Sequence, residues 1–130
     1  MIQERTTAPV MPLRIFADRL RIWIDQKLAM KTPYTGDWTL RVTYESGIPA
    51  HVIDFQEDEF ARDVMTTNKP YTEHELSVLI TTSVQCLKTK IEATVTSDFW
   101  GEINTHVRLE SGRYVGVRCS SKQNVVRRKI

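Results

Sequence analysis

The side chains in this sequence that could do chemistry are three histidines, two cysteines and one cluster of carboxylates. His51, His74 and His106 have neither HxH nor HxxxH spacing and no nearby cysteine, so they are interpreted as surface histidines. Cys86 and Cys119 lie far apart without a CxxC partner and are interpreted as two buried thiols. The sequence therefore predicts no metal site and no cofactor.

The motifs that usually mark catalysis are missing. There is no GxSxG elbow, and the 5 glycines form no phosphate-binding loop. A carboxylate pair for acid–base work could come from Glu57-Asp58-Glu59 with Asp54 and Asp63. A charge run of this kind is typical of a solvated face, so we expect no catalytic residues and a protein that is not an enzyme.

Charge is distributed unevenly along the chain. From His106 to Ile130 there are seven Lys and Arg against Glu110 alone, a net charge of +6, whereas the preceding residues carry 11 Lys and Arg against 15 Asp and Glu, a net charge of −4. Basic side chains neutralise phosphates, and Tyr114 could stack on an unpaired base. The same basic region could equally dock on an acidic protein partner or on a second copy's acidic cluster.

Two segments have helical periodicity. Apolar residues recur at steps of three and four from Leu13 to Leu28, after Pro12, which suits a first helical turn, and before Pro33, which ends the helix. Thr72 and Glu75 have capping-box spacing and predict the start of a second helix. The expected buried stripe of that helix is Leu76, Leu79, Ile80, Ser83, Val84, Leu87 and Ile91.

Each predicted helix is followed by a predicted hairpin with a Glu-Ser-Gly loop. The expected strands are 38–44 and 50–55 around Glu45-Ser46-Gly47, and 99–109 and 113–119 around Glu110-Ser111-Gly112. Residues 56–67 are expected to include a short helix. In the second hairpin, a three-residue loop would place Val107 opposite Val115 on the apolar face and Tyr114 on the other face. In the first hairpin, the same loop length would place Ala50 on the apolar face.

The two hairpins match at a fixed offset of 65 residues, since Gly36, Val42 and Glu45 correspond to Gly101, Val107 and Glu110. We therefore expect an α+β fold of two helix-plus-hairpin units, in the order αββαββ, with possible internal duplication of 13–65 and 73–130. The hairpins would form one four-stranded antiparallel sheet with both helices packed on one face, leaving the other face wet.

One domain is expected over residues 1–130, with a flexible arm at 1–11 and a basic tail at 120–130. No apolar run approaches the ~20 residues needed to span a bilayer. The N-terminal residues also lack the apolar core of a signal peptide. These features favour a cytoplasmic protein without a membrane partner.

The function expected from these features is binding. The first hypothesis is a small protein-interaction, inhibitor or assembly module acting through the open sheet face and the basic C-terminus, with self-association through edge strands as one form of it. The alternative is binding of single-stranded nucleic acid or RNA by the same face. Trp100 is either a cap over the sheet edge or a partner anchor. The residues expected to make contact are Trp100, His106, Arg108, Arg113, Tyr114, Arg118, Lys122, Arg127, Arg128 and Lys129.

Overall fold

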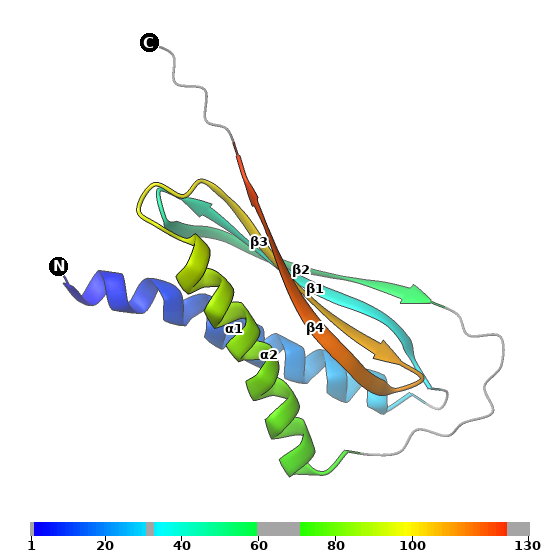
Figure 1. Ribbon diagram of the computed structural model, residues 1–130. Coiled ribbons are helices and arrows are strands. Elements are labelled where there is room, and N and C mark those ends of the chain that lie inside the picture. The colour runs from blue at the N-terminus through cyan, green and yellow to red at the C-terminus, as the bar shows by residue number, and fades with distance from the viewer. Residues whose placement is uncertain (1, 31–32, 60–70, 125–130) are drawn as a thin grey trace.

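The computed structural model describes residues 2–30, 33–59 and 71–124, and these form a helical layer packed on a sheet (Figure 1). The elements in chain order are α1 (Ile2–Leu28), β1 (Thr35–Glu45), β2 (Ile48–Glu59), α2 (Glu73–Thr94), β3 (Gly101–Glu110) and β4 (Arg113–Gln123). Among the described helices, none is long and apolar enough to cross a lipid bilayer.

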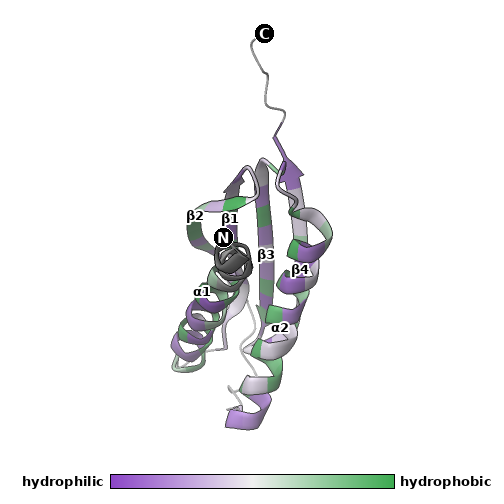
Figure 2. Ribbon diagram, turned by 90° about the vertical axis from the view of Figure 1, so that its left-hand side faces the viewer, coloured by the Kyte–Doolittle hydropathy of each residue, from purple (hydrophilic) through white to green (hydrophobic). Residues whose placement is uncertain are grey.

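The four strands form one antiparallel sheet in the order β2-β1-β3-β4. Both helices lie on the same side of this sheet, α1 mainly against the β1–β2 hairpin and α2 against the β3–β4 hairpin (Figure 2). The predicted αββαββ order and the α+β class are confirmed. The opposite side of the sheet carries neither helix, and we call it the open face.

The start of the second helix is confirmed, and the start of the first is not. Thr72 caps α2: its hydroxyl accepts a hydrogen bond from the Glu75 amide at 3.1 Å, and the Glu75 carboxylate accepts one from the Thr72 amide at 3.0 Å. The prediction that α1 begins at Pro12 is wrong, because the helix begins at Ile2 and includes most of the segment expected as an arm. A proline that suits a first turn does not prevent the chain before it from being helical.

The hairpin loops have two residues rather than the predicted three. Glu45 pairs with Ile48 and Glu110 with Arg113, and both loop residues have positive φ, 51° and 76° in the first loop and 48° and 76° in the second. This is the conformation of a type I′ turn. One extra residue then bulges from the returning strand of each hairpin, Ala50 in β2 and Val115 in β4.

The short loop and the bulge together change which side chains face the helices. Between the loop and the bulge, every side chain points to the face opposite to the one predicted. Val115 is therefore exposed, and Tyr114 turns towards α2. Beyond the bulge the predicted faces return, but each residue sits opposite a partner two positions away from the expected one. Val107, for example, pairs with Val117 instead of Val115.

Two further element boundaries differ from the prediction. The second strand continues to Glu59 instead of ending at Phe55, and the rest of 56–67, the segment expected to include a short helix, lies outside the described residues. Strand β4 extends to Gln123, so the first residues of the expected basic tail belong to the sheet. The longer strands lengthen both edges of the open face.

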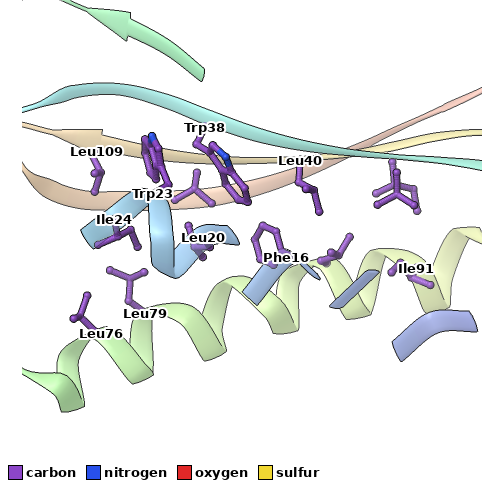
Figure 3. Packing of buried hydrophobic residues seen from close by; sticks show 14 of the residues in the cluster. Phe16, Leu20, Trp23, Ile24, Trp38, Leu40, Leu76, Leu79, Ile91 and Leu109 are labelled. Atoms are coloured by element: carbon purple, nitrogen blue, oxygen red, sulfur yellow. The ribbon is translucent and has the colours of Figure 1, made fainter. Parts of the chain in front are cut away.

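The core lies between the sheet and the two helices (Figure 3). Trp38 of β1 lies near its centre, with its ring stacked on Phe16 at a centroid distance of 5.5 Å and on Trp23 at 6.1 Å. Alternate residues of β1 and β3 complete the sheet side, as period-two alternation predicts. The fully buried residues of this set include Leu40, Val42, Ile103, Val107 and Leu109.

The two units are arranged symmetrically in the sheet. Strands β1 and β3 pair so that Leu40 lies opposite Thr105, its counterpart 65 positions later. A local two-fold axis through this pair therefore relates the first hairpin to the second. The shared turn conformation and the shared bulge position follow the same relation. This symmetry agrees with the predicted repeat.

Candidate functional site

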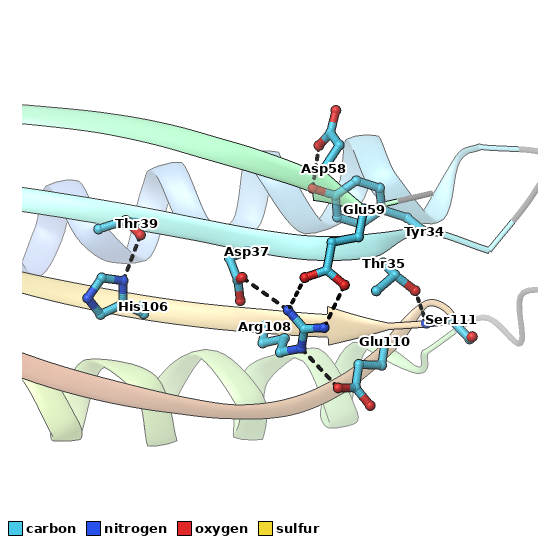
Figure 4. A network of polar contacts seen from close by, with 10 residues as sticks. All are labelled: Tyr34, Thr35, Asp37, Thr39, Asp58, Glu59, His106, Arg108, Glu110 and Ser111. Atoms are coloured by element: carbon cyan, nitrogen blue, oxygen red, sulfur yellow. Dashed lines mark hydrogen bonds and ion pairs between the residues drawn. The ribbon is translucent and has the colours of Figure 1, made fainter. Parts of the chain in front are cut away.

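The open face is the surface that the fold leaves uncovered, and Figure 4 views it with the helices behind the strands. Alternation along the strands places both acidic and basic side chains on it, with the acidic ones slightly more numerous. The acidic ones are Asp37, Glu45, Glu57, Glu59, Glu102 and Glu110, and the basic ones are Arg41, Arg108, Arg113, Arg118 and Lys122.

Arg108 is the centre of an ion-pair network on this face (Figure 4). Its guanidinium donates to Asp37 at 3.0 Å, to both oxygens of Glu59 at 3.1 and 2.9 Å, and to Glu110 at 2.9 Å. The hydrogen bonds from Arg108 hold the pKa of Glu59 below its ordinary value, and the carboxylates raise the pKa of Arg108. Three carboxylates thus already neutralise the side chain that the sequence offered as a phosphate ligand.

A second group of polar contacts joins the two central strands. The Thr39 hydroxyl and His106 Nδ1 lie 2.8 Å apart, and Arg41 Nε donates to Asn104 Oδ1 at 2.8 Å. The Arg41 guanidinium also lies over the Phe55 ring, 5.3 Å from its centroid. These contacts link side chains of neighbouring strands in the middle of the open face.

A hollow of about 390 Å³ opens on this face above β3 and β4. Gly116 forms part of its wall, and a Cβ added there would meet no atom within 4 Å. The bulged Val115, 54% exposed, stands beside it. The residues that line the hollow are Asp37, His106, Arg108, Val115, Gly116, Val117 and Arg118. A strand position without a side chain therefore leaves a depression that a partner's side chain can enter.

His106 lies in the wall of this hollow, opposite Arg118 in the sheet. Burial lowers the pKa of His106, and the nearby positive charge of Arg118 lowers it further. The imidazole is therefore neutral at pH 7, and the hollow has a hydrogen-bonding side chain there rather than a third positive charge.

We expect Arg118→Ala to raise the pKa of His106 towards the ordinary histidine value of about 6.5, because the substitution removes a nearby positive charge. An NMR titration of the imidazole resonances measures the change, and Lys122→Ala serves as a control on the same strand. Because the pKa of His106 is lower in the folded state, its effect on stability is absent above about pH 6.5 and becomes unfavourable as the pH falls below that value. An unchanged His106 titration in Arg118→Ala would contradict this electrostatic account.

The two edge strands of the sheet carry opposite charge. Strand β2 contains Asp54, Glu57, Asp58 and Glu59 and no Lys or Arg, whereas β4 contains Arg113, Arg118 and Lys122 and no Asp or Glu. Exposed apolar side chains accompany both strands: Ile53 is 50% and Phe55 44% exposed on β2, and Val115 is 54% exposed on β4. The open face therefore changes from acidic to basic across the sheet, with apolar groups near both edges.

Part of the acidic cluster that was expected to form a solvated face points towards the helices and has a structural role there. The helix-facing members of β2 accept hydrogen bonds from aromatic donors: Asp54 from Trp38 Nε1 at 3.1 Å and Asp58 from the Tyr34 hydroxyl at 2.6 Å. Gln56 accepts one from Trp23 Nε1 at 3.0 Å. These bonds satisfy the polar atoms of Trp38, Tyr34 and Trp23 beside a smaller hollow of about 280 Å³ between α1 and β2.

The residues predicted as contacts fall into five groups. His106, Arg108, Arg118 and Lys122 share the open face, and Trp100, 37% exposed, immediately precedes β3. Arg113, at the turn end of the open face, has its guanidinium over the Tyr71 ring, 4.7 Å from the centroid. The open-face position predicted for Tyr114 is wrong, because the bulge turns its hydroxyl towards α2, 3.1 Å from the Ser83 hydroxyl. Arg127, Arg128 and Lys129 lie outside the described residues.

Two features of the structure were not predicted from the sequence. The hollow at Gly116 does have a sequence signal, a lone glycine in a strand pattern, which often marks a bulge or a close approach. The proximity of Cys86 and Cys119 has no such signal, because it depends on how α2 packs against β4.

Within the described ranges, no group of three or more His, Cys, Asp or Glu side chains could hold a metal ion.

Comparison with known proteins adds no relative to this picture: no family model, no curated protein and no solved structure matches the chain.

Proposed function

We propose that this protein is a non-enzymatic protein-interaction domain that binds its partner through the open face. The observation that carries the proposal is the hollow at Gly116, which lies next to the exposed Val115 on the side of the sheet that neither α1 nor α2 covers. A depression flanked by an apolar side chain and framed by charges is the usual form of an interface pocket.

The charge pattern defines the kind of partner. A complementary surface is basic where it covers β2 and acidic where it covers β4, so that like charges do not meet. A second copy of this chain offers such a surface. Stacking two open faces about a two-fold axis parallel to the strands would place the acidic β2 of one copy over the basic β4 of the other. A heterologous protein with the same pattern would fit equally well.

The alternative, nucleic-acid binding, has one observation in its favour, the basic edge strand β4. Three observations favour a protein partner instead. The open face carries more acidic than basic side chains, Arg108 is held by three carboxylates, and Tyr114 is turned away from this face. A polyanion would meet six carboxylates on the face it must cover.

The proposal is tested by placing a photo-crosslinking amino acid at Val115, on the open face. The matched control is Val78 on α2, which is 51% exposed against 54% for Val115. We expect crosslinks to a defined partner, a second copy included, from position 115 and not from position 78. Gly116→Leu, whose Cβ meets no atom within 4 Å and whose side chain would occupy the hollow, should reduce crosslinking at least about tenfold, the effect of losing roughly 1.4 kcal/mol of binding free energy.

Equal crosslinking from both positions, or none from position 115, would contradict the proposal. A salt titration with fluorescent oligonucleotides decides the alternative. Affinity for an oligonucleotide that falls steeply with salt and is lost in Arg118→Ala would favour nucleic-acid binding over a protein partner.

A further inference from the structure

Cys86 and Cys119 meet where α2 packs on β4. Their sulfur atoms lie 3.3 Å apart, although the whole of β3 separates the two residues in the chain. Two sulfur atoms joined in a disulfide are about 2.05 Å apart. An approach of roughly 1 Å, shared between the two side chains, would therefore bring the sulfurs to bonding distance. Both thiols are free and only partly buried, so a small reagent can reach this seam.

We propose that Cys86 and Cys119 form an oxidisable dithiol, a modification site that closes to an intramolecular disulfide by exchange with a small disulfide such as oxidised glutathione. The chain contains 2 cysteines, so each has only the other as an intramolecular partner. The proposal does not depend on the open face, because Cys119 lies on the helix side of β4.

The exchange has two steps and needs no other oxidant. In the first, the Cys86 thiolate attacks one sulfur of the small disulfide, which forms a mixed disulfide at Cys86 and releases one small thiolate. In the second, the Cys119 sulfur attacks Cys86 Sγ and displaces the second small thiolate. The protein loses two electrons and two protons, and the small disulfide is reduced to two thiols.

The surroundings of the two sulfurs set this order. Burial raises the pKa of the Cys119 thiol to about 12, and that thiol points at Thr105 Oγ1, 3.5 Å away. Cys119 is therefore protonated at neutral pH and a slow nucleophile towards reagents from solution. In the mixed disulfide, the Cys86 sulfur that Cys119 attacks is held beside the Cys119 sulfur. The Lys90 charge and the Thr105 hydroxyl both favour the Cys119 thiolate that this second step requires.

Closure would tie α2 covalently to an edge strand that otherwise contacts it through packing and the Ser83–Tyr114 hydroxyl pair. A cross-link between distant residues reduces the freedom of the unfolded chain, which stabilises the folded state. We expect the oxidised protein to melt roughly 10 °C higher than the reduced protein.

The experiment incubates the reduced full-length protein with oxidised glutathione and measures intact mass, free thiols and melting temperature. The expected product has lost two hydrogen atoms, has no free thiol and carries no glutathione. In the single variants, Cys119→Ser should form the glutathione adduct at Cys86 at least about tenfold faster than Cys86→Ser forms it at Cys119. Cys86→Ala and Cys119→Ala repeat the comparison without a hydroxyl, in case serine disturbs the packing.

Stable glutathione adducts on the wild-type protein, covalent dimers on a non-reducing gel, or a lower melting temperature after closure would each overturn the proposal. Repeating the reaction in denaturant supplies the remaining control. There the fold no longer holds the sulfurs together, so adducts should predominate. Equal yields of the intramolecular disulfide with and without denaturant would show that the native geometry plays no part.

Discussion

Trp38→Ala is expected to lower the free energy of unfolding by about 3–5 kcal/mol, the usual cost of truncating a large buried aromatic residue. Trp38 is 2% exposed and stacks on Phe16 and Trp23. The substitution also leaves the core helix α1 without its main contact on β1. Urea unfolding followed by circular dichroism measures the loss, with the slope m checked for constancy.

Trp100→Ala is the matched control, since Trp100 is 37% exposed and immediately precedes the central strand β3. Its cost should be about 1 kcal/mol or less. If Trp38→Ala does not fold, Trp38→Phe keeps a ring in the core and loses the hydrogen bond from Nε1 to Asp54 together with part of the ring packing. That variant should lose about 1–2 kcal/mol. Equal losses for Trp38→Ala and Trp100→Ala would contradict the placement of the core.

Gly101→Ala is expected to cost about 2–3 kcal/mol, because the added methyl group has no room. Its Cβ would collide with the backbone carbonyl oxygen of Lys122 and lie 2.9 Å from the Cα of Gln123, both in the neighbouring strand β4. Strand β4 would have to move away from β3 at this end of the sheet. Thermal and denaturant unfolding of the variant measure the loss.

Gly116→Ala provides the matched control on the same pair of strands. An added Cβ meets nothing within 4 Å there, so the substitution should leave stability unchanged or raise it by about 0.4–1 kcal/mol through a stiffer unfolded chain. The two alanine variants thus separate a glycine required by packing from a glycine that leaves a hollow. If Gly116→Ala is less stable than the wild-type protein, other atoms of the protein itself would have to occupy the hollow.

The two proposals about this protein rest on opposite sides of the sheet. The interaction face depends on Val115, Gly116 and the charged edges, whereas the dithiol lies between α2 and the helix-facing side of β4. Oxidation of the cysteines should therefore leave crosslinking from Val115 unchanged. This separation lets each proposal fail without the other.

Local sequence signals determined much of the fold because the contacts they describe are short in sequence. The Thr72–Glu75 capping box joins residues three positions apart, and it marks the start of α2 correctly. The Ser-Gly pairs mark both turns, since glycine readily adopts the positive φ that they require. Alternation in β1 and β3 identifies the core face because both strands are central and each has one side against the helices.

Only the tertiary structure decided the features on which the two proposals depend. Alternation cannot reveal a bulge, because one extra residue reverses the faces locally and leaves the composition unchanged. Tyr114 and Val115 therefore exchanged sides relative to the prediction. The carboxylate partners of Arg108 come from β1, β2 and the end of β3, and the strand order brings them together. The 3.3 Å separation of Cys86 and Cys119 likewise depends on the packing of α2 against β4, a long-range arrangement that no local pattern encodes.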